Sequence, residues 1–224
     1  MRTHYWETRQ SMTPQKSLQF LKEGNMRFIN NLRLNHNHLE VINQTSEKQF
    51  PFATILSCSD SRVPVELVFD QGLGDIFSIR LAGNVASKFA IGSMEYACEA
   101  LGSKLFVVLG HTHCGAVKGA ADNFEMGNLT ALLDEIKPAV DAEKETSHNR
   151  NSSNKQFVQN VIGLNVTHQL ETILKSSDII RNKVKSGEVG LIGAIYDIET
   201  GAVNFSDELT NLNIQHEKAE VYQG

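Results

Sequence analysis

The chain has little cysteine, no long hydrophobic run and no surplus of positive charge. Its three cysteines among 224 residues are few and odd in number, which argues against a disulfide framework and suits a reducing compartment. No apolar stretch approaches the ~20 residues that a membrane helix needs. The first residues, MRTHYWETRQ, lack the apolar segment of a signal peptide. We therefore expect a cytoplasmic protein, or a periplasmic one if an N-terminal signal has been removed.

The charge balance is mildly acidic. The 21 Lys and Arg residues against 26 Asp and Glu residues give a formal net charge of −5, so nothing suggests a nucleic acid or an anionic membrane as partner. A chain of this length with 41% hydrophobic residues can bury a sizeable core in one domain. It contains no internal repeat, and its low-complexity piece at 145–155 is typical of a solvated loop. We interpret residues 1–224 as a single domain with an N-terminal helical arm at about 1–35.

Apolar periodicity predicts helices that alternate with strands. Thr13 and Pro14 are typical of an N-cap followed by proline at the first helical position, and helical spacing of apolar residues then predicts a helix over 14–32. Nearly continuous apolar runs predict buried strands at 52–57, 76–81, 104–110 and 188–197. A turn at 199–201 predicts a hairpin with residues 202–205. Further helices are predicted at 89–101, 128–142 and 155–176.

This order of elements predicts an α/β fold, with a mainly parallel sheet of four to five strands flanked by helices. In such sheets, ligands gather beyond the carboxyl ends of the strands. A functional site is therefore expected just after residue 57 and just after residue 110.

Two cysteines and a histidine lie at these places. Cys58 follows the first predicted strand, and His111 and Cys114 follow the third. The i, i+3 spacing lets His111 and Cys114 reach one ion from a turn at a helix start, and thiolate and imidazole ligands favour zinc. Three protein ligands leave the fourth tetrahedral position open, as in a catalytic site. The alternative is that both cysteines are buried core residues, as free cysteines often are.

Asp60 and Arg62 lie beside this candidate zinc site, two residues apart. They can form a bidentate ion pair that fixes the carboxylate and keeps it ionised, or only a surface salt bridge of little consequence. An oriented Asp60 is a natural acceptor for a zinc-bound water or hydroxide. Alternatively, Asp60 occupies the fourth zinc position itself and closes the site.

Two segments, CSDSRVP at 58–64 and GHTHCGAV at 110–117, resemble the signature motifs Cys-x-Asp-x-Arg and His-x-x-Cys of the β-class carbonic anhydrases. The stretches ELVFDQGLGDIFSIRLAGNVA at 66–86 and GSMEYA at 92–97 resemble the bacterial branch. The resemblance implies a β-carbonic anhydrase-like fold and the reversible hydration of CO2 to bicarbonate and a proton, by a zinc-bound hydroxide. It also implies a homodimer or homotetramer with CO2 and bicarbonate as partners. The charge balance and the lack of a long apolar run already argue against nucleic acid and membrane as partners.

The same resemblance assigns roles to individual positions. The implied zinc ligands are Cys58, His111 and Cys114, with Asp60 as a further ligand only in a closed form. Asp60 and Arg62 would be the catalytic dyad. The implied substrate-binding positions are Gln49, Phe77, Tyr96, which is expected to come from a neighbouring subunit, and Gly115. His113 is interpreted as exposed or one layer outside the ligands, and Cys98 as core packing.

Three other functions are compatible with the motifs. The same scaffold could hydrolyse carbonyl sulfide or carbon disulfide, because pocket shape rather than the motif selects the substrate. A thiol enzyme with Cys58 as nucleophile and Arg62 as anion clamp is disfavoured, because Asp60 within the loop would repel a phosphate. A zinc-stabilised interaction module would normally use four protein ligands, a set that Asp60 would complete.

Overall fold

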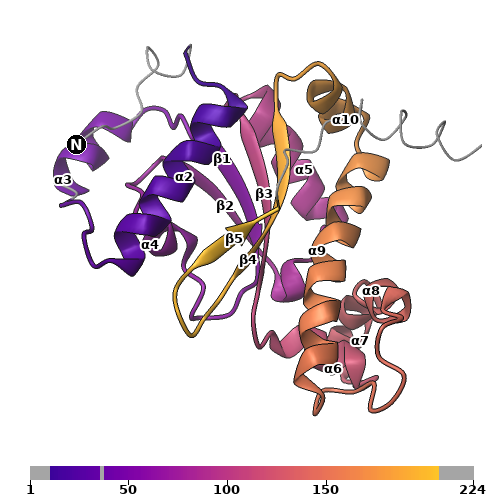
Figure 1. Ribbon diagram of the computed structural model, residues 1–224. Helices are drawn as coiled ribbons and strands as arrows, with labels where there is room; N and C mark the ends of the chain where they lie inside the picture. Colours follow the sequence, from indigo (N-terminus) through magenta and orange to yellow (C-terminus); the bar gives the residue numbers. More distant parts are fainter. Residues whose placement is uncertain (1–10, 36–37, 207–224) are drawn as a thin grey trace, which may run out of the picture.

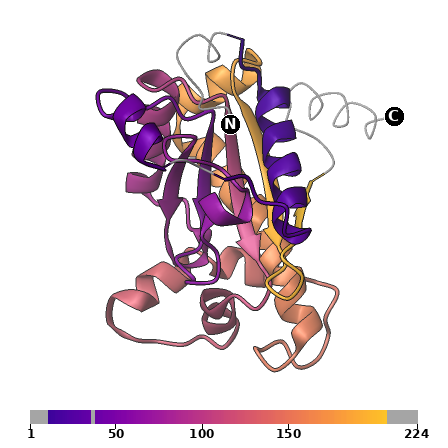
Figure 2. The ribbon, with the colours of Figure 1, turned by 90° about the vertical axis from the view of Figure 1, so that its left-hand side faces the viewer.

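A five-stranded sheet forms the centre of the computed structural model, which describes residues 11–35 and 38–206 (Figures 1 and 2). The strand order is β2-β1-β3-β4-β5. The first four strands in this order run parallel, and β5 pairs antiparallel with β4. Their bounds are β1 Ala53–Ser57, β2 Ile76–Arg80, β3 Leu105–His111, β4 Gly190–Tyr196 and β5 Val203–Phe205. The predicted α/β class, the mainly parallel sheet and the terminal hairpin are confirmed.

Helices cover both faces of the sheet. Both β1 and β3 are buried over their whole length, because a parallel strand between two helical layers has no solvent face. On one face, a hydrophobic core joins the sheet to α2 (Pro14–Ile29) and α4 (Val65–Val68). On the other face, a second core joins it to α5 (Lys88–Glu99), α9 (Lys155–Ser176) and α10 (Asp178–Lys185) (Figure 1).

The N-terminal helix α2 begins where its sequence predicts. Thr13 Oγ1 accepts a hydrogen bond of 3.2 Å from the N–H of Lys16, and Pro14 occupies the first turn. The helix ends at Ile29, three residues before the predicted end, since Asn31 adopts a left-handed φ of 55° that no helix continues.

A buried asparagine fixes α2 to the rest of the fold. Asn25 Nδ2 donates to the backbone oxygens of Val68 (3.1 Å) and Gly201 (2.9 Å), and its Oδ1 accepts from the N–H of Val203 (2.9 Å). One side chain therefore joins α2 to α4 and to the hairpin between β4 and β5.

The single helix predicted over residues 128–142 is wrong. Two helices occupy this region, α7 (Gly127–Asp134) and α8 (Lys137–Ala142). Pro138 explains the break: within a continuous helix it would lack the N–H that bonds to the carbonyl of Asp134, and its ring would clash with that carbonyl. In the first turn of a separate helix it is tolerated.

The predicted helix over 155–176 is confirmed as α9, with Asn154 accepting a cap bond from the N–H of Phe157. Several short elements were not predicted, because each is shorter than the window of about 11–18 residues over which helical periodicity is judged. Besides α4 and α10, they are α3 (His38–Thr45), the 3₁₀ turn η1 (Ala82–Asn84) and α6 (Gly115–Ala121). None of the described helices is long and apolar enough to span a membrane. Helices α6, α7 and α8 lie beyond the carboxyl ends of the parallel strands (Figure 2), where they build the floor of the site.

Candidate metal centre

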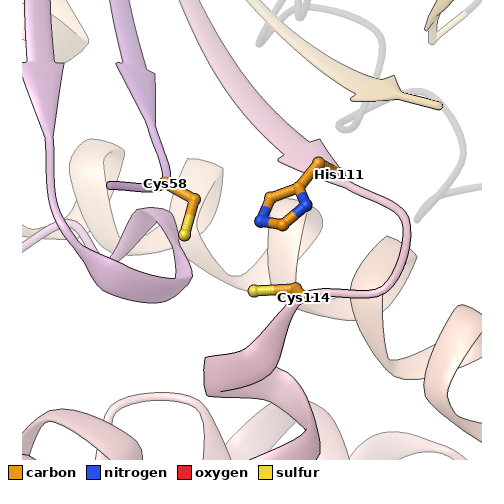
Figure 3. A group of neighbouring side chains, drawn as sticks. All are labelled: Cys58, His111 and Cys114. Carbon is orange, nitrogen blue, oxygen red and sulfur yellow. The ribbon is translucent and has the colours of Figure 1, made fainter. Parts of the chain in front are cut away.

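Three side chains converge at the carboxyl ends of β1 and β3 (Figure 3). Cys58 directly follows β1, His111 is the last residue of β3, and Cys114 directly precedes α6. Their ligand atoms all lie within 4.8 Å of one another, and all three residues are buried. The parallel pairing of β1 with β3, in which Ser57 lies opposite Leu109, delivers both strand ends to the same edge. The structure therefore brings together the three residues expected to bind zinc.

The histidine is prepared to act as a ligand. His111 Nδ1 lies 2.9 Å from the backbone oxygen of Thr112, and a carbonyl can only accept, so Nδ1 carries the proton and Nε2 holds a free lone pair. This buried Nε2 has no hydrogen-bond partner among the described residues. A buried acceptor without a partner is costly, and a cation between Nε2 and the two sulfurs would satisfy it.

The pKa values of the two thiols are shifted in opposite directions. A hydrogen bond with Cys114 is the main cause that lowers the pKa of Cys58, while that same contact and burial raise the pKa of the Cys114 thiol. A metal ion would let both groups ionise, because a coordinating thiol is deprotonated outright. Two sulfurs and one imidazole nitrogen in a buried cluster form a donor set that suits zinc and leaves one coordination position for water or substrate.

Asp60 and Arg62 form a bidentate ion pair beside the cluster. Arg62 Nε donates to Asp60 Oδ1 at 2.9 Å, and Nη2 donates to Oδ2 at 2.7 Å. The backbone N–H of Arg62 adds a third bond to Oδ1. These bonds hold the pKa of the Asp60 carboxyl well below its usual range, so the carboxylate stays ionised. Asp60 is not in the cluster of neighbouring ligand atoms found among the described residues, and both of its carboxylate oxygens accept hydrogen bonds from Arg62.

A second arginine, Arg80, supports the loop that carries Cys58 and Asp60. Its Nη2 donates to the backbone oxygen of Asp60 at 2.7 Å, and its Nε donates to that of Cys58 at 3.3 Å. Sequence reasoning did not place Arg80 at the site. A signal was available, because Arg80 ends the strand beside β1 and therefore lies at the same edge of the sheet, opposite Ser57.

The remaining residues near the motifs have separate surroundings. Gly115 begins α6 next to Cys114, at the metal centre. His113 has a left-handed φ of 59°, and its Nε2 lies 3.0 Å from Glu199 Oε1, outside the cluster. Cys98 is buried in α5, where burial raises the pKa of its thiol to about 11. A thiol with that pKa is inert at neutral pH, which agrees with the expected packing role.

The other three substrate-binding candidates gather elsewhere in the chain. Gln49 and Tyr96 line one pocket of about 690 Å³, and the ring of Tyr96 lies 6.3 Å from that of Phe77, centroid to centroid. Gln49 precedes β1 whereas Cys58 follows it, and at about 3.3 Å per residue the five residues of β1 separate them by roughly 16 Å. Within one chain these three residues do not join the metal centre.

Comparison with known proteins shows that the sequence is similar to carbonic anhydrases. A sequence model described as carbonic anhydrase matches residues 53–203. Carbonic anhydrase 2 of Mycobacterium tuberculosis is 34% identical over 200 residues, which cover 86% of this chain and 92% of that protein. A carbonic anhydrase of Mycolicibacterium smegmatis is 30% identical over 198 residues, with coverages of 86% and 93%.

Solved structures similar to this chain are also carbonic anhydrases, of the β class. The β-carbonic anhydrase CcaA superimposes with a TM-score of 0.67 at 27% identity, over 87% of this chain and 93% of that one. One of two β-carbonic anhydrases of Sordaria macrospora that are described as tetrameric also superimposes with a TM-score of 0.67. It is 25% identical, and the match covers 78% of this chain and 90% of that one.

Proposed function

This chain is an enzyme of the β-carbonic anhydrase family, and on that premise we propose that it catalyses the reversible hydration of CO2 to bicarbonate and a proton with one zinc ion per chain. The observation that carries the proposal is the buried cluster of Cys58, His111 and Cys114. A cation bound by the two sulfurs would also satisfy the buried imidazole nitrogen of His111, which has no hydrogen-bond partner among the described residues.

Each ligand residue has a defined task. The Thr112 carbonyl fixes the His111 tautomer that presents Nε2 to the ion. Cys58 and Cys114 supply two negative charges, which hold a divalent cation in a buried site. When bound, zinc would supply a Lewis acid that lowers the pKa of water and orients it toward CO2.

The Asp60–Arg62 pair would orient the reacting water. The Asp60 carboxylate, kept ionised by Arg62, can only accept hydrogen bonds. It therefore selects the orientation in which the water donates to it and keeps a lone pair free for CO2. Arg62 occupies both carboxylate oxygens, so the same fork keeps Asp60 from becoming a fourth metal ligand.

The site would be completed by a second copy of the chain, in a homodimer or homotetramer. Gln49 and Tyr96 line one pocket, Gln49 lies before the amino end of β1 whereas Cys58 follows its carboxyl end, and Tyr96 is 52% exposed. Together with Phe77, these residues would form the wall of the CO2 pocket in the partner's active site. The relatives from Sordaria macrospora are described as tetrameric, which supports this assembly.

Stopped-flow CO2 hydration and zinc analysis test the proposal together. The wild type is expected to hold one zinc per chain and to hydrate CO2, whereas Cys58→Ser loses both, since serine is a poor zinc ligand at neutral pH. Cys98→Ser is the matched control: it also changes a buried thiol, but one outside the cluster, and should keep zinc and activity. Full zinc occupancy in Cys58→Ser would refute the ligand assignment. Hydrolysis of carbonyl sulfide without CO2 hydration would refute the proposed substrate.

A further inference from the structure

A backbone N–H donates a hydrogen bond to one of the metal-binding sulfurs. The donor is Gly83, whose nitrogen lies 3.4 Å from Cys58 Sγ. Gly83 adopts a left-handed φ of 66°, and a Cβ at this position would lie 2.4 Å from Ile136 Cδ1. The left-handed conformation favours glycine here, a larger residue would have to displace the Ile136 side chain, and the Gly83 N–H is directed at the sulfur.

Two buried amides hold this glycine from the opposite side. Asn165 Nδ2 donates to the Gly83 carbonyl at 2.9 Å. Gln169, one turn later on α9, donates to Asn165 Oδ1 at 3.0 Å and accepts from the N–H of Ala86 at 2.8 Å. Its Nε2 also donates to the Glu135 carbonyl at 3.2 Å. The two amides thus connect the buried face of α9 to Gly83 and Ala86, the two ends of the 83–86 segment.

The burial of this pair is unusual for its surroundings. Asn165 and Gln169 are each 1% exposed, and the other buried positions of α9 are apolar, namely Phe157, Val158, Val161, Ile162, Val166 and Ile173. Removing two primary amides from water is unfavourable unless their hydrogen bonds are made. Here those bonds are made with each other and with the backbone around Gly83, so the pair serves the geometry of that turn.

We propose that Asn165 and Gln169 are positioning residues of the metal centre: they hold Gly83 so that its N–H donates to Cys58 Sγ and weakens the electron donation of that thiolate to the metal. Two thiolates neutralise the charge of a divalent ion and reduce its strength as an acid. A hydrogen bond to one sulfur withdraws part of that electron density, and partners of metal ligands tune affinity and reactivity in this way. The inference rests on the proposed metal site. It adds that two residues of α9 would influence the Lewis acidity of the bound metal ion.

Cobalt substitution provides the main test, because Co²⁺ bound by thiolates absorbs in the near ultraviolet through sulfur-to-metal charge transfer. Asn165→Leu keeps a similar volume and removes the bond to Gly83. The charge-transfer band is expected to move to longer wavelength, because a sulfur without its hydrogen bond gives up electron density more easily. Competition with a chelator is expected to show about tenfold weaker zinc binding, because losing the bonds that orient the Cys58 thiolate outweighs its stronger electron donation. Gln169→Leu should change both readouts in the same direction, through Asn165.

Ile173→Val is the matched control, since it alters a fully buried apolar residue of α9 about one turn beyond Gln169. It is expected to lower the midpoint of thermal unfolding without moving the band. If Asn165→Leu does not fold, Asn165→Ser, which is smaller and keeps a hydroxyl, replaces it. An unmoved band and unchanged zinc affinity in a folded Asn165 variant would overturn the inference. A wild type that binds no cobalt with thiolate character would instead overturn the metal site itself.

Discussion

Two inactive variants of this enzyme are expected to restore each other's activity when they share an assembly. One variant is Cys58→Ser, which removes a metal ligand. The other combines Gln49→Leu with Tyr96→Ala, which removes the exposed pocket wall but leaves the metal centre intact. Because roughly 16 Å of β1 separates these two regions within one chain, each complete active site in the proposed assembly would take one region from each of two copies.

The size of the rescue follows from this geometry. In a random assembly of equal amounts of the two variants, a site is complete only if its metal comes from one variant and its wall from the other. Each condition holds for about half of the chains, so about a quarter of the sites should be intact, in dimers and tetramers alike.

Co-expression of the two variants, followed by stopped-flow CO2 hydration, provides the assay. The two variants purified separately and mixed without subunit exchange serve as control, and should show only their own residual rates. Zinc content should be about half of the wild-type value, because only one variant binds the metal. Residual rates alone after co-expression, in mixed oligomers verified by two affinity tags, would refute the idea that the wall serves the partner's site.

Asp60→Asn is expected to keep zinc and lose about a hundredfold in kcat/KM, because an amide does not act as an anionic acceptor; a near-normal kcat/KM would contradict the role of the dyad. Arg62→Ala should also lose activity with zinc retained, since Asp60 is then free to take the fourth metal position, and loss of the metal instead would point to a structural role. Activity of the wild type should rise from about pH 6.5 to about pH 9, because two thiolates leave the metal a weak acid. Asp60, whose pKa Arg62 holds well below its usual range, stays ionised throughout, so a flat profile would refute this account. Asn25→Ala should lower the free energy of unfolding by about 3 kcal/mol in urea titrations, because one buried and two partly buried backbone groups lose their partner.

The metal centre could be predicted from sequence because its chemistry is local and its topology is regular. Residue types and the i, i+3 spacing indicate the ligands, and parallel strands deliver their carboxyl ends to one edge. Cys58 and His111 are therefore expected to meet even without knowledge of helix packing. The sheet was predictable for a similar reason, since β1 and β3 are buried on both faces and appear as continuous apolar runs.

Other features depend on tertiary structure that no short pattern shows. Gln49 and Tyr96 are remote from the metal in one chain, which becomes visible only when the positions of β1 and α5 are known. Asn165 and Gln169 are amides on a mostly apolar helix face. Their role becomes apparent only when the structure shows that the 83–86 segment packs against them. The break between α7 and α8 is different, because Pro138 is a sequence signal for it. The apolar periodicity on both sides of Pro138 nevertheless favoured one continuous helix.

The position of the metal ligands at the ends of two paired strands also determines when zinc can enter the protein. Cys58 and His111 are about fifty residues apart in the chain, and they meet only after β1 and β3 have formed their parallel ladder. Such non-local pairing is a slow step in folding, so metal uptake follows the assembly of the sheet. Small zinc-binding domains, in contrast, fold only around the ion. Under zinc limitation this chain should therefore accumulate as a folded precursor that gains activity upon metal supply, without a new round of folding.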